Sequence, residues 1–373
     1  MNYIGSKFSL LDEIRAMLAR QGVAGGTFCD LFSGTTVVAQ MARQSGFQVI
    51  ANDLQAYSVV MQKAFLETDG YPPFARLRQA LSAIDSLDAG TRRHGFGLGA
   101  EPGAESAPLR RVLAYLESLP PRPGPFYETY CEGGTAGRNY FSRENGQRLE
   151  AIRETIEAWT REGLVDEAER HLLLASLIET MDQLANTASV YGAFLKHIKK
   201  TALAPLVLRL PRLIPGGGPH RSSRADGNDL VRQLAAEGPH DVLYLDPPYN
   251  HRQYHANYHL LETIARWDLA DFEPQGKTGL RPADAQKSRY CSRRHVKSAF
   301  AELIEAADFK HILVSYNNEG LLPEADLREL LSAKGRCDFH KVAYKRFRAD
   351  LNGAKRQYKA DETQEFLFYV KVR

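Results

Sequence analysis

Two short apolar runs, each followed by a helical pattern, restrict the fold of this chain more than any other feature. Residues 27–32 are followed by a turn at 33–35 and a helical segment from Val37, and residues 48–53 are followed by a helical segment at 56–67. Strands and helices that alternate in this way form parallel sheets with helices on their faces. We therefore expect an α/β fold.

Strand patterns return in the last third of the chain. Residues 241–246 form an apolar run that would be buried on both faces of a sheet, and residues 310–316 form another. Residues 340–344 and 366–370 are expected to close the sheet as an antiparallel pair.

Helical patterns dominate between these two groups of strands. An amphipathic helix is predicted at 144–161, capped by Ser142 or Asn145, and a more apolar helix at 170–185. Residues 90–108 are rich in Gly, Ala, Pro and Ser and are predicted to be a long exposed loop.

The glycine- and proline-rich stretch at 215–219 marks the return to the sheet. The sequence thus predicts a core formed by residues 1–69 and 222–373, split by a helical insertion at 70–221.

The composition is that of a soluble globular protein, with 43% hydrophobic and 25% charged residues among 373. No apolar run approaches the roughly 18 residues needed to span a bilayer. Residues 1–7 lack the apolar stretch of a secretory signal, so we expect a cytoplasmic protein. The four cysteines form no C-x-x-C pair, which predicts reduced thiols and no zinc site.

The net charge of +3 is small, but the basic residues are unevenly placed. Residues 183–225 contain no acid and carry seven basic residues, and residues 277–297 carry seven basic residues against the single acid Asp284. Local positive fields of this kind suit a phosphate backbone. A solvated basic surface is the alternative.

The tetrapeptide Asp246-Pro247-Pro248-Tyr249 ends the buried run at 241–246. In an open α/β sheet, ligands bind beyond the carboxyl ends of the strands. The Asp246 carboxylate and the Pro247 carbonyl can accept the two hydrogens of an amino group whose lone pair is conjugated into a ring, which makes that nitrogen nucleophilic. The ring of Tyr249 offers a face on which an extruded base can stack. The alternative is an ordinary turn at the end of a strand.

The turn after the first expected strand is a candidate ligand-binding loop, because Gly34 allows close approach to the backbone. It is not a phosphate loop, since no Gly-Lys pair follows, and the G-x-G-x-x-G turn of dinucleotide-binding folds is absent. Asp53 ends the next strand, where nucleoside-binding α/β folds place an acid on the ribose hydroxyls. Asp229 is a candidate for binding an adenine amino group, or belongs to a surface turn.

Together, these motifs and their order resemble the D12 class of adenine-specific DNA methyltransferases, which includes the Dam-like enzymes. Residues 3–7, Tyr-Ile-Gly-Ser-Lys, look like the family's N-terminal cofactor motif, and residues 30–34 look like its F-x-G-x-G motif. Asp53 matches the acidic ribose ligand, residues 246–249 match the catalytic motif, and residues 314–318 and 346–365 resemble the later sheet motifs.

The resemblance covers most of the chain and implies a Rossmann-like, S-adenosylmethionine-dependent methyltransferase fold with an inserted, mostly helical target-recognition domain. It implies four catalytic residues: Asp246, Pro247, Pro248 and Tyr249. It implies cofactor contacts from Tyr3, Lys7, Asp30, Phe32, Ser33, Gly34, Asp53, Asp229 and Asp246. The second Gly of the F-x-G-x-G motif is replaced by Thr36, which is expected to alter the detail of the cofactor loop.

In this family the segment between the second and third core motifs carries target recognition, which corresponds to the helical insertion. We expect DNA contacts from amide, aromatic and basic side chains: Asn139, Tyr140, Lys196, Lys199, Lys200, Arg289, Arg293 and Arg294. For Tyr140 the alternative is a core position, because buried aromatic residues are common. His251 and His255 have no further metal-type ligands clustered near them, so no metal is expected.

The resemblance therefore implies a site-specific enzyme that methylates N6 of an adenine flipped out of double-stranded DNA. We expect this enzyme to belong to a bacterial or phage-type restriction–modification system, in which a restriction endonuclease acts separately. We expect it to be a monomer that does not bind membranes. An enzyme that methylates N4 of cytosine would usually carry Ser at position 246, and RNA or protein amide methylation more often uses Asn there. A DNA-binding relative without catalysis is the alternative from another functional class.

Overall fold

Residues 3–89, 93–282, 287–345 and 362–373 are described by the computed structural model, in which the chain divides into two units. The sheet unit contains Ile4–Val59, Pro219–Asn257 and Ala283–Arg373. The helical unit contains Met1–Tyr3, Val60–Gly218 and Tyr258–Pro282.

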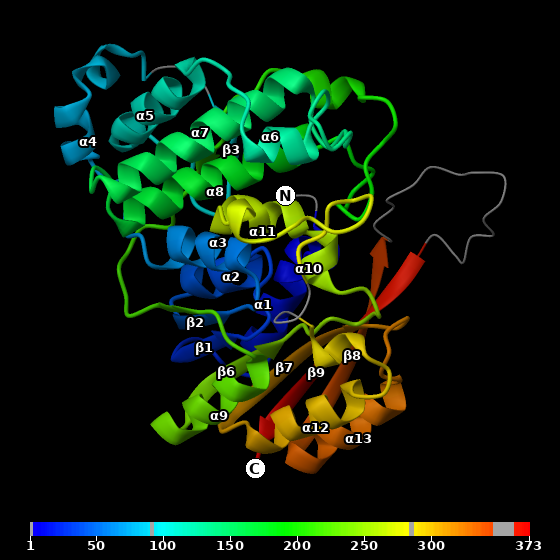
Figure 1. The fold of residues 1–373 in the computed structure, drawn as a ribbon. Helices are drawn as coiled ribbons and strands as arrows, with labels where there is room; N and C mark the ends of the chain where they lie inside the picture. Colours follow the sequence, from blue (N-terminus) through cyan, green and yellow to red (C-terminus); the bar gives the residue numbers. More distant parts are fainter. Residues whose placement is uncertain (1–2, 90–92, 283–286, 346–361) are drawn as a thin grey trace. The chain divides into compact units, whose positions relative to one another are not determined.

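In the described part of the chain, a seven-stranded, mostly parallel sheet forms the sheet unit (Figure 1). Its order is β5-β2-β1-β6-β7-β9-β8. The strands are β1 Thr27–Asp30, β2 Gln48–Asn52, β5 Arg221–Ser223, β6 His240–Leu245, β7 Phe309–Asn317, β8 Gly335–Lys345 and β9 Glu362–Val372. β9 pairs antiparallel with β7 and β8, and the other described pairs of neighbouring strands are parallel. The expected α/β class and the terminal antiparallel pair are confirmed.

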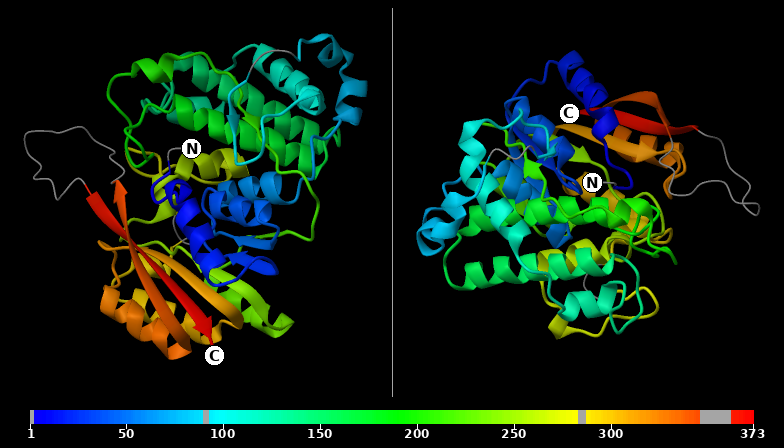
Figure 2. Two further views of the ribbon diagram at one scale, coloured as in Figure 1. Left: turned by 180° about the vertical axis from the view of Figure 1, so that it is seen from behind. Right: turned by 90° about the horizontal axis from the view of Figure 1, so that it is seen from above.

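Helices cover both faces of this sheet (Figures 1 and 2). The helices of the sheet unit are η1 Phe8–Leu10, α1 Leu11–Arg20, α2 Val37–Gln44, α9 Gly227–Glu237, α10 Tyr254–Asn257, η6 Arg289–Cys291, α12 Val296–Ala306 and α13 Glu324–Lys334. One face carries α9, α12 and α13, and the other carries α1 and α2. Helix α3, Ala56–Leu66, begins in the sheet unit and continues into the helical unit.

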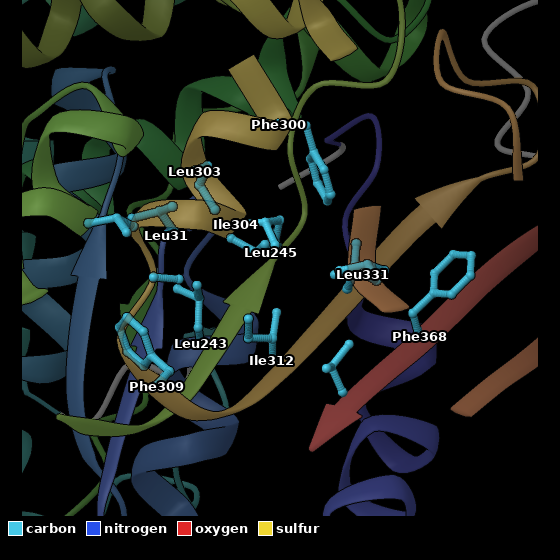
Figure 3. Packing of buried hydrophobic residues seen from close by; sticks show 14 of the residues in the cluster. Leu31, Leu243, Leu245, Phe300, Leu303, Ile304, Phe309, Ile312, Leu331 and Phe368 are labelled. Atoms are coloured by element: carbon cyan, nitrogen blue, oxygen red, sulfur yellow. The ribbon is translucent and has the colours of Figure 1, made fainter. Parts of the chain in front are cut away.

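The core between β6 and α12 fixes the strand that leads to the tetrapeptide. Leu243 and Leu245 of β6 belong to one buried cluster with Leu303 and Ile304 of α12 (Figure 3). Burying each such side chain contributes roughly 1.5–3 kcal/mol relative to leaving it exposed. The backbone is therefore held firmly up to Leu245, immediately before Asp246.

The helical unit is built around α7, Arg143–Arg161, and α8, Glu167–Leu184. The Ser142 hydroxyl caps α7 by accepting a hydrogen bond from the Asn145 amide, so Ser142 is the cap of the two expected candidates. Helix α8 begins three residues earlier than predicted, because Asp166 and Glu169 form a capping box. The other elements are α4 Ala75–Ala80, η2 Ser82–Ser86, β3 Gly95–Phe96, η3 Ala104–Ser106, α5 Ala107–Ser118, α6 Pro125–Tyr130, η4 Lys200–Leu203, β4 Leu210–Pro211, α11 His259–Arg266 and η5 Leu269–Asp271.

The expected exposed loop at 90–108 is confirmed only in part: residues 97–103 lie in neither a helix nor a strand, whereas residues 95–96 and 104–108 belong to β3, η3 and α5. Residues 90–92 lie outside the described part. Strand β3 pairs with β4, and α5 already begins at Ala107. The Arg93 side chain is buried and donates to the carbonyl of Leu208 at 3.0 Å. A Gly- and Ser-rich composition does not reveal a pairing with residues more than a hundred positions later.

The helical unit also includes a segment that follows the tetrapeptide along the chain, Tyr258–Pro282. Arg153 of α7 donates from Nε to the carbonyl of Ile264 at 2.7 Å, and the Tyr130 hydroxyl donates to the carbonyl of Gly279 at 2.9 Å. These contacts join residues far apart in the sequence, and Ile264 and Gly279 lie outside the predicted insertion at 70–221. Among the described helices, none combines the length and apolar character needed to cross a membrane.

Candidate active site

Three carboxylates lie at the same edge of the parallel sheet. Asp30 ends β1, Asp53 follows β2, and Asp246 follows β6. Because these three strands are adjacent and parallel, their carboxyl ends meet at one edge. The sequence motifs singled out from three distant segments are therefore brought together within the sheet unit.

Lys7 lies against the carboxylate of the tetrapeptide. Its Nζ is 2.9 Å from Asp246 Oδ1 and 3.1 Å from Glu365 Oε1, and it donates to the carbonyl of Gly5 at 3.1 Å. The side chain of Lys7 is 5% exposed, that of Glu365 3%, and that of Asp246 18%. Asp246 is thus the member of this group that a substrate can reach.

The charged side chains of this group change one another's pKa values. Burial raises the pKa of Asp246, and the negative charge of Glu365 raises it further. The Lys7 ammonium lowers it, and the pKa of Asp246 is about 6. Burial alone would lower the pKa of Lys7, but the carboxylates of Asp246 and Glu365 outweigh it and raise that pKa. Lys7 therefore stays charged, and Asp246 is ionised at neutral pH.

Asp30 organises the loop between β1 and α2. Its Oδ2 accepts hydrogen bonds from the Ser33 hydroxyl and the Ala39 amide, both at 3.1 Å. Its Oδ1 is buried and has no hydrogen-bond partner within the described structure. Burial raises the pKa of Asp30 to about 7, against the two hydrogen bonds and with the help of the negative charges of Asp246 and Asp53.

Asp53 braces the same loop from the neighbouring strand. Its Oδ2 accepts from the Gly34 amide at 2.8 Å and its Oδ1 from the Gln55 amide at 2.9 Å. Phe32 is half-buried and lies edge-on to Tyr290, with ring centroids 5.1 Å apart. The predicted loop residues thus form one arrangement around Asp30 and Asp53.

Thr36 stands where the F-x-G-x-G motif has its second Gly, and its φ is +67°. This is the left-handed region that Gly enters without steric cost. The Thr36 side chain is fully buried, and its hydroxyl has no hydrogen-bond partner within the described structure. Thr36 therefore has the strained backbone conformation that Gly would adopt more easily, and its buried hydroxyl lacks a hydrogen-bond partner.

The tetrapeptide is held from both sides. Pro247 is buried, whereas Pro248 and Tyr249 are half-buried. The Tyr249 carbonyl accepts from the Leu321 amide at 2.8 Å. Gly5 has a φ of +80°, and a β-carbon there would lie 3.6 Å from the Tyr249 ring. The N-terminal motif and the tetrapeptide are therefore packed together.

Two further predicted cofactor residues contact other side chains. Tyr3 belongs to the helical unit, where its ring stacks on Tyr258 with centroids 4.4 Å apart. Asp229 lies in the first turn of α9 and pairs with Arg232 at 2.5 Å, with 61% of its side chain exposed. The residue that caps α9 is Asp226, which accepts from the amides of Asn228 and Asp229.

The predicted DNA-contacting residues of the helical unit lie in two segments, 139–140 and 196–200, that are joined by hydrogen bonds. The Asn139 side chain donates to the carbonyl of Lys196 at 3.2 Å, and Lys199 Nζ donates to that of Thr187 at 2.7 Å. Lys196 and Lys200 are exposed. Tyr140 itself is fully buried, and its hydroxyl bonds the carbonyls of Tyr191 and Thr278. The prediction of a direct DNA contact by Tyr140 is corrected: its side chain joins segments of the core.

The remaining predicted DNA-contacting residues lie in the sheet unit. Arg293 and Arg294 are exposed in a turn before α12. Arg289 makes a bidentate pair with Glu302, at 2.6 and 2.7 Å. A phosphate would have to compete with Glu302 for Arg289, whereas Arg293 and Arg294 lie at the surface.

Metal ligands do not cluster in the described residues, where no group of three or more His, Cys, Asp or Glu side chains is arranged to hold an ion. The four cysteines are free thiols. Sequence reasoning missed Glu365 and Ser315 as members of the candidate site. A signal for Glu365 exists, since it is an acid next to the apolar strand residues 366–370.

Comparisons with known proteins identify the family of this chain. A family model described as D12 class N6 adenine-specific DNA methyltransferase matches residues 3–330. The chain is similar to Type II methyltransferase M.NlaIII of Neisseria lactamica, with 41% identity over 370 residues and 98% of each protein covered. It is 35% identical over 377 residues to Type II methyltransferase M.FokI of Planomicrobium okeanokoites, covering 99% of this chain and 52% of that protein. It is 30% identical over 375 residues to Type II methyltransferase M.CviAII of Paramecium bursaria Chlorella virus 1, covering 100% and 98%. The chain therefore belongs to the D12 class of N6-adenine-specific DNA methyltransferases.

Proposed function

We propose that this protein transfers a methyl group from S-adenosylmethionine to N6 of an adenine flipped out of duplex DNA, with Asp246 as the central catalytic residue. The observation that carries the proposal is the placement of Asp246. It follows a buried strand, contacts the buried cation Lys7 at 2.9 Å, and precedes two prolines. The family description is adenine-specific and does not favour cytosine N4 as the target.

The residues present fit the proposed cofactor. S-adenosylmethionine carries hydroxyl, amino and ammonium donors, and the sheet edge offers acceptors. Asp30 has a buried oxygen without a hydrogen-bond partner, and Asp53 lies at the end of β2. Asp53 is the proposed partner of the ribose hydroxyls. The other proposed cofactor contacts are Tyr3, Lys7, Phe32, Ser33, Gly34, Asp229 and Asp246.

The chemistry follows from the two acceptors of the tetrapeptide. The Asp246 carboxylate accepts one N6 hydrogen and the Pro247 carbonyl accepts the other, which localises the lone pair on nitrogen. When bound, S-adenosylmethionine supplies a methyl group whose bond to sulfur breaks toward sulfur as the N6 lone pair forms the new N–C bond. Asp246 is placed to take the proton that N6 loses, and Tyr249 to stack on the flipped base.

We propose that the helical unit recognises the target sequence. Two exposed lysines, Lys196 and Lys200, flank Lys199, and Asn139 is bonded to the same segment through the carbonyl of Lys196. Basic side chains of this kind hold phosphates, and amides read base edges. Arg293 and Arg294 of the sheet unit are proposed as further phosphate contacts.

The biological setting is inferred from the relatives, which are named Type II methyltransferases and modification methylases. We propose that this chain protects DNA against a separately acting restriction endonuclease, in the cytoplasm and as a monomer. The substrate requires this location in a bacterial cell, because the DNA is there.

Nucleoside mass spectrometry tests the proposed function. Unmethylated duplex DNA of mixed sequence is incubated with the protein and S-adenosylmethionine, digested and analysed. The expected product is N6-methyladenine. Formation of N4-methylcytosine, or of no methylated base by protein that binds DNA and cofactor, would contradict the proposal.

A further inference from the structure

Glu365 is a buried acid whose position is not explained by the sheet alone. It lies on β9 opposite Asn317 of β7, and only 3% of its surface is exposed. Its Oε1 accepts from the Ser315 hydroxyl at 2.7 Å, and its Oε2 lies 3.4 Å from the Asn317 amide. A carboxylate buried in this way is costly unless it is paired with a cation.

The cation is Lys7, which Glu365 shares with Asp246. The three protons of an ammonium group allow three acceptors. Lys7 has Asp246 at 2.9 Å, Glu365 at 3.1 Å and the carbonyl of Gly5 at 3.1 Å. Two carboxylates therefore compete for one positive charge, and this group of three side chains has a net charge of −1.

This sharing changes what Asp246 can do. If Lys7 paired with Asp246 alone, it would offset most of the negative charge of that carboxylate and weaken it as an acceptor. Glu365 draws part of the ammonium charge to itself and fixes the position of Nζ from β9. The other titratable groups near Asp246 are Asp30 at the end of β1 and Tyr244 on β6, and Tyr249 lies near Lys7.

We propose that Glu365 is a positioning residue for methyl transfer: it holds Lys7 against Asp246 and keeps Lys7 from neutralising that carboxylate. The inference rests on the proposed function, because it assigns Asp246 the task of accepting an N6 hydrogen. Glu365 acts through Lys7 and Asp246.

The test compares the pH dependence of single-turnover methyl transfer in wild type, Glu365→Gln and Lys7→Gln, with saturating DNA and S-adenosylmethionine. Removing the negative charge of Glu365 makes Asp246 easier to ionise. The acid limb of the pH–rate profile, where the rate falls as Asp246 gains a proton, should therefore move to lower pH by about 0.5–1 unit. Removing the positive charge of Lys7 should move it to higher pH. The rate on the pH plateau should fall by about tenfold in Glu365→Gln, as expected for coupled neighbours.

Opposite shifts in the two variants support the inference. An unchanged acid limb in Glu365→Gln, or shifts in the same direction, would overturn it, because a merely structural role moves stability and not the titration of Asp246. Glu329→Gln on α13 is the matched control, since Glu329 is exposed and should leave rate and acid limb unchanged. If wild type forms no N6-methyladenine, the proposed function fails, and that outcome is distinct from wild-type activity with an unshifted variant.

Glu365→Asp keeps the inference testable if Glu365→Gln does not fold. It retains the charge but shortens the reach toward Lys7. Its acid limb should move in the same direction as in Glu365→Gln, by less than half as much, with a measurable loss of plateau rate. A Glu365→Asp variant indistinguishable from wild type in both quantities would overturn the inference.

Discussion

The ammonium group of Lys7 lies 2.9 Å from the carboxylate of Asp246, although the two residues come from opposite halves of the chain. Both side chains are largely withdrawn from water, so their interaction is stronger than that of an exposed ion pair. The contact links the N-terminal motif to the tetrapeptide and orients the carboxylate at the sheet edge.

The rate of methyl transfer should fall as the pH drops through about 6. Burial and Glu365 raise the pKa of Asp246 to about 6 despite Lys7, so the carboxylate gains a proton near that pH. A protonated Asp246 is a weaker acceptor for an N6 hydrogen. The measurement is the single-turnover rate from pH 5 to 8 with both substrates saturating. A rate at pH 5 equal to that at pH 8, in folded protein, would contradict the assignment of Asp246.

Replacing Asp30 by Asn should stabilise the fold increasingly as the pH rises. The pKa of Asp30 in the folded protein is about 7 and its ordinary value is 3.8, so the native state holds the proton more tightly than the unfolded state. The free energy of unfolding of wild type therefore falls as the pH rises from about 3.8 to about 7, whereas the Asn side chain does not titrate. The advantage of Asp30→Asn over wild type should grow by on the order of 2 kcal/mol between pH 5 and pH 8, measured by urea unfolding.

Asp12→Asn is the control for that experiment, because the Asp12 side chain is 95% exposed. Its free energy of unfolding should differ from that of wild type by no more than a few tenths of a kcal/mol, as for most surface substitutions. If the stability advantage of Asp30→Asn shrank with rising pH, folding would lower the pKa of Asp30 rather than raise it, which would contradict the prediction.

Thr36→Gly should stabilise the protein by about 1 kcal/mol. Gly removes the cost of the left-handed conformation and the buried hydroxyl without a hydrogen-bond partner, which together outweigh the lost burial of one methyl group. Thr35→Gly, at a neighbouring position without positive φ, should instead destabilise by roughly 0.5–1 kcal/mol. Urea unfolding midpoints measure both, and equal destabilisation by the two variants would contradict the strain at Thr36.

The double variant Lys196→Ala/Lys200→Ala should weaken DNA binding at all sequences and reduce its salt dependence. Each lysine that holds a phosphate contributes about 0.9 to the slope of log affinity against log salt, so the slope should fall by about 1.8. Lys334→Ala, which removes a lysine whose Nζ donates to the carbonyl of Glu305 in the sheet unit, is the matched control. An unchanged slope in the double variant would remove Lys196 and Lys200 from the proposed DNA interface.

Local patterns in the sequence predict the sheet well. The strand-turn-helix units from Thr27 onward, the buried strand before Asp246 and the terminal antiparallel pair all depend on short-range periodicity and turn residues. The start of α8 at Glu167 was also predictable in principle, because Asp166 and Glu169 form a capping box.

Long-range contacts in the candidate site were not predictable in the same way. The ion pair of Glu365 with Lys7 joins two ends of the chain, and nothing in the local pattern selects that partner. Tyr140 stands between Asn139 and Phe141, a setting that suits a residue that contacts bases as well as a core residue. Its burial, and the hydrogen bonds from its hydroxyl to the carbonyls of Tyr191 and Thr278, favour the core position over a contact with bases.

The catalytic role of Asp246 is tested most directly by nucleoside mass spectrometry on Asp246→Ala beside wild type, with duplex DNA and S-adenosylmethionine carrying a deuterated methyl group. Wild type should produce labelled N6-methyladenine. The folded variant should still bind DNA and produce at least about 100-fold less labelled product, because one of the two acceptors for the amino hydrogens is gone. Wild-type rates of labelled N6-methyladenine formation by Asp246→Ala would contradict the account.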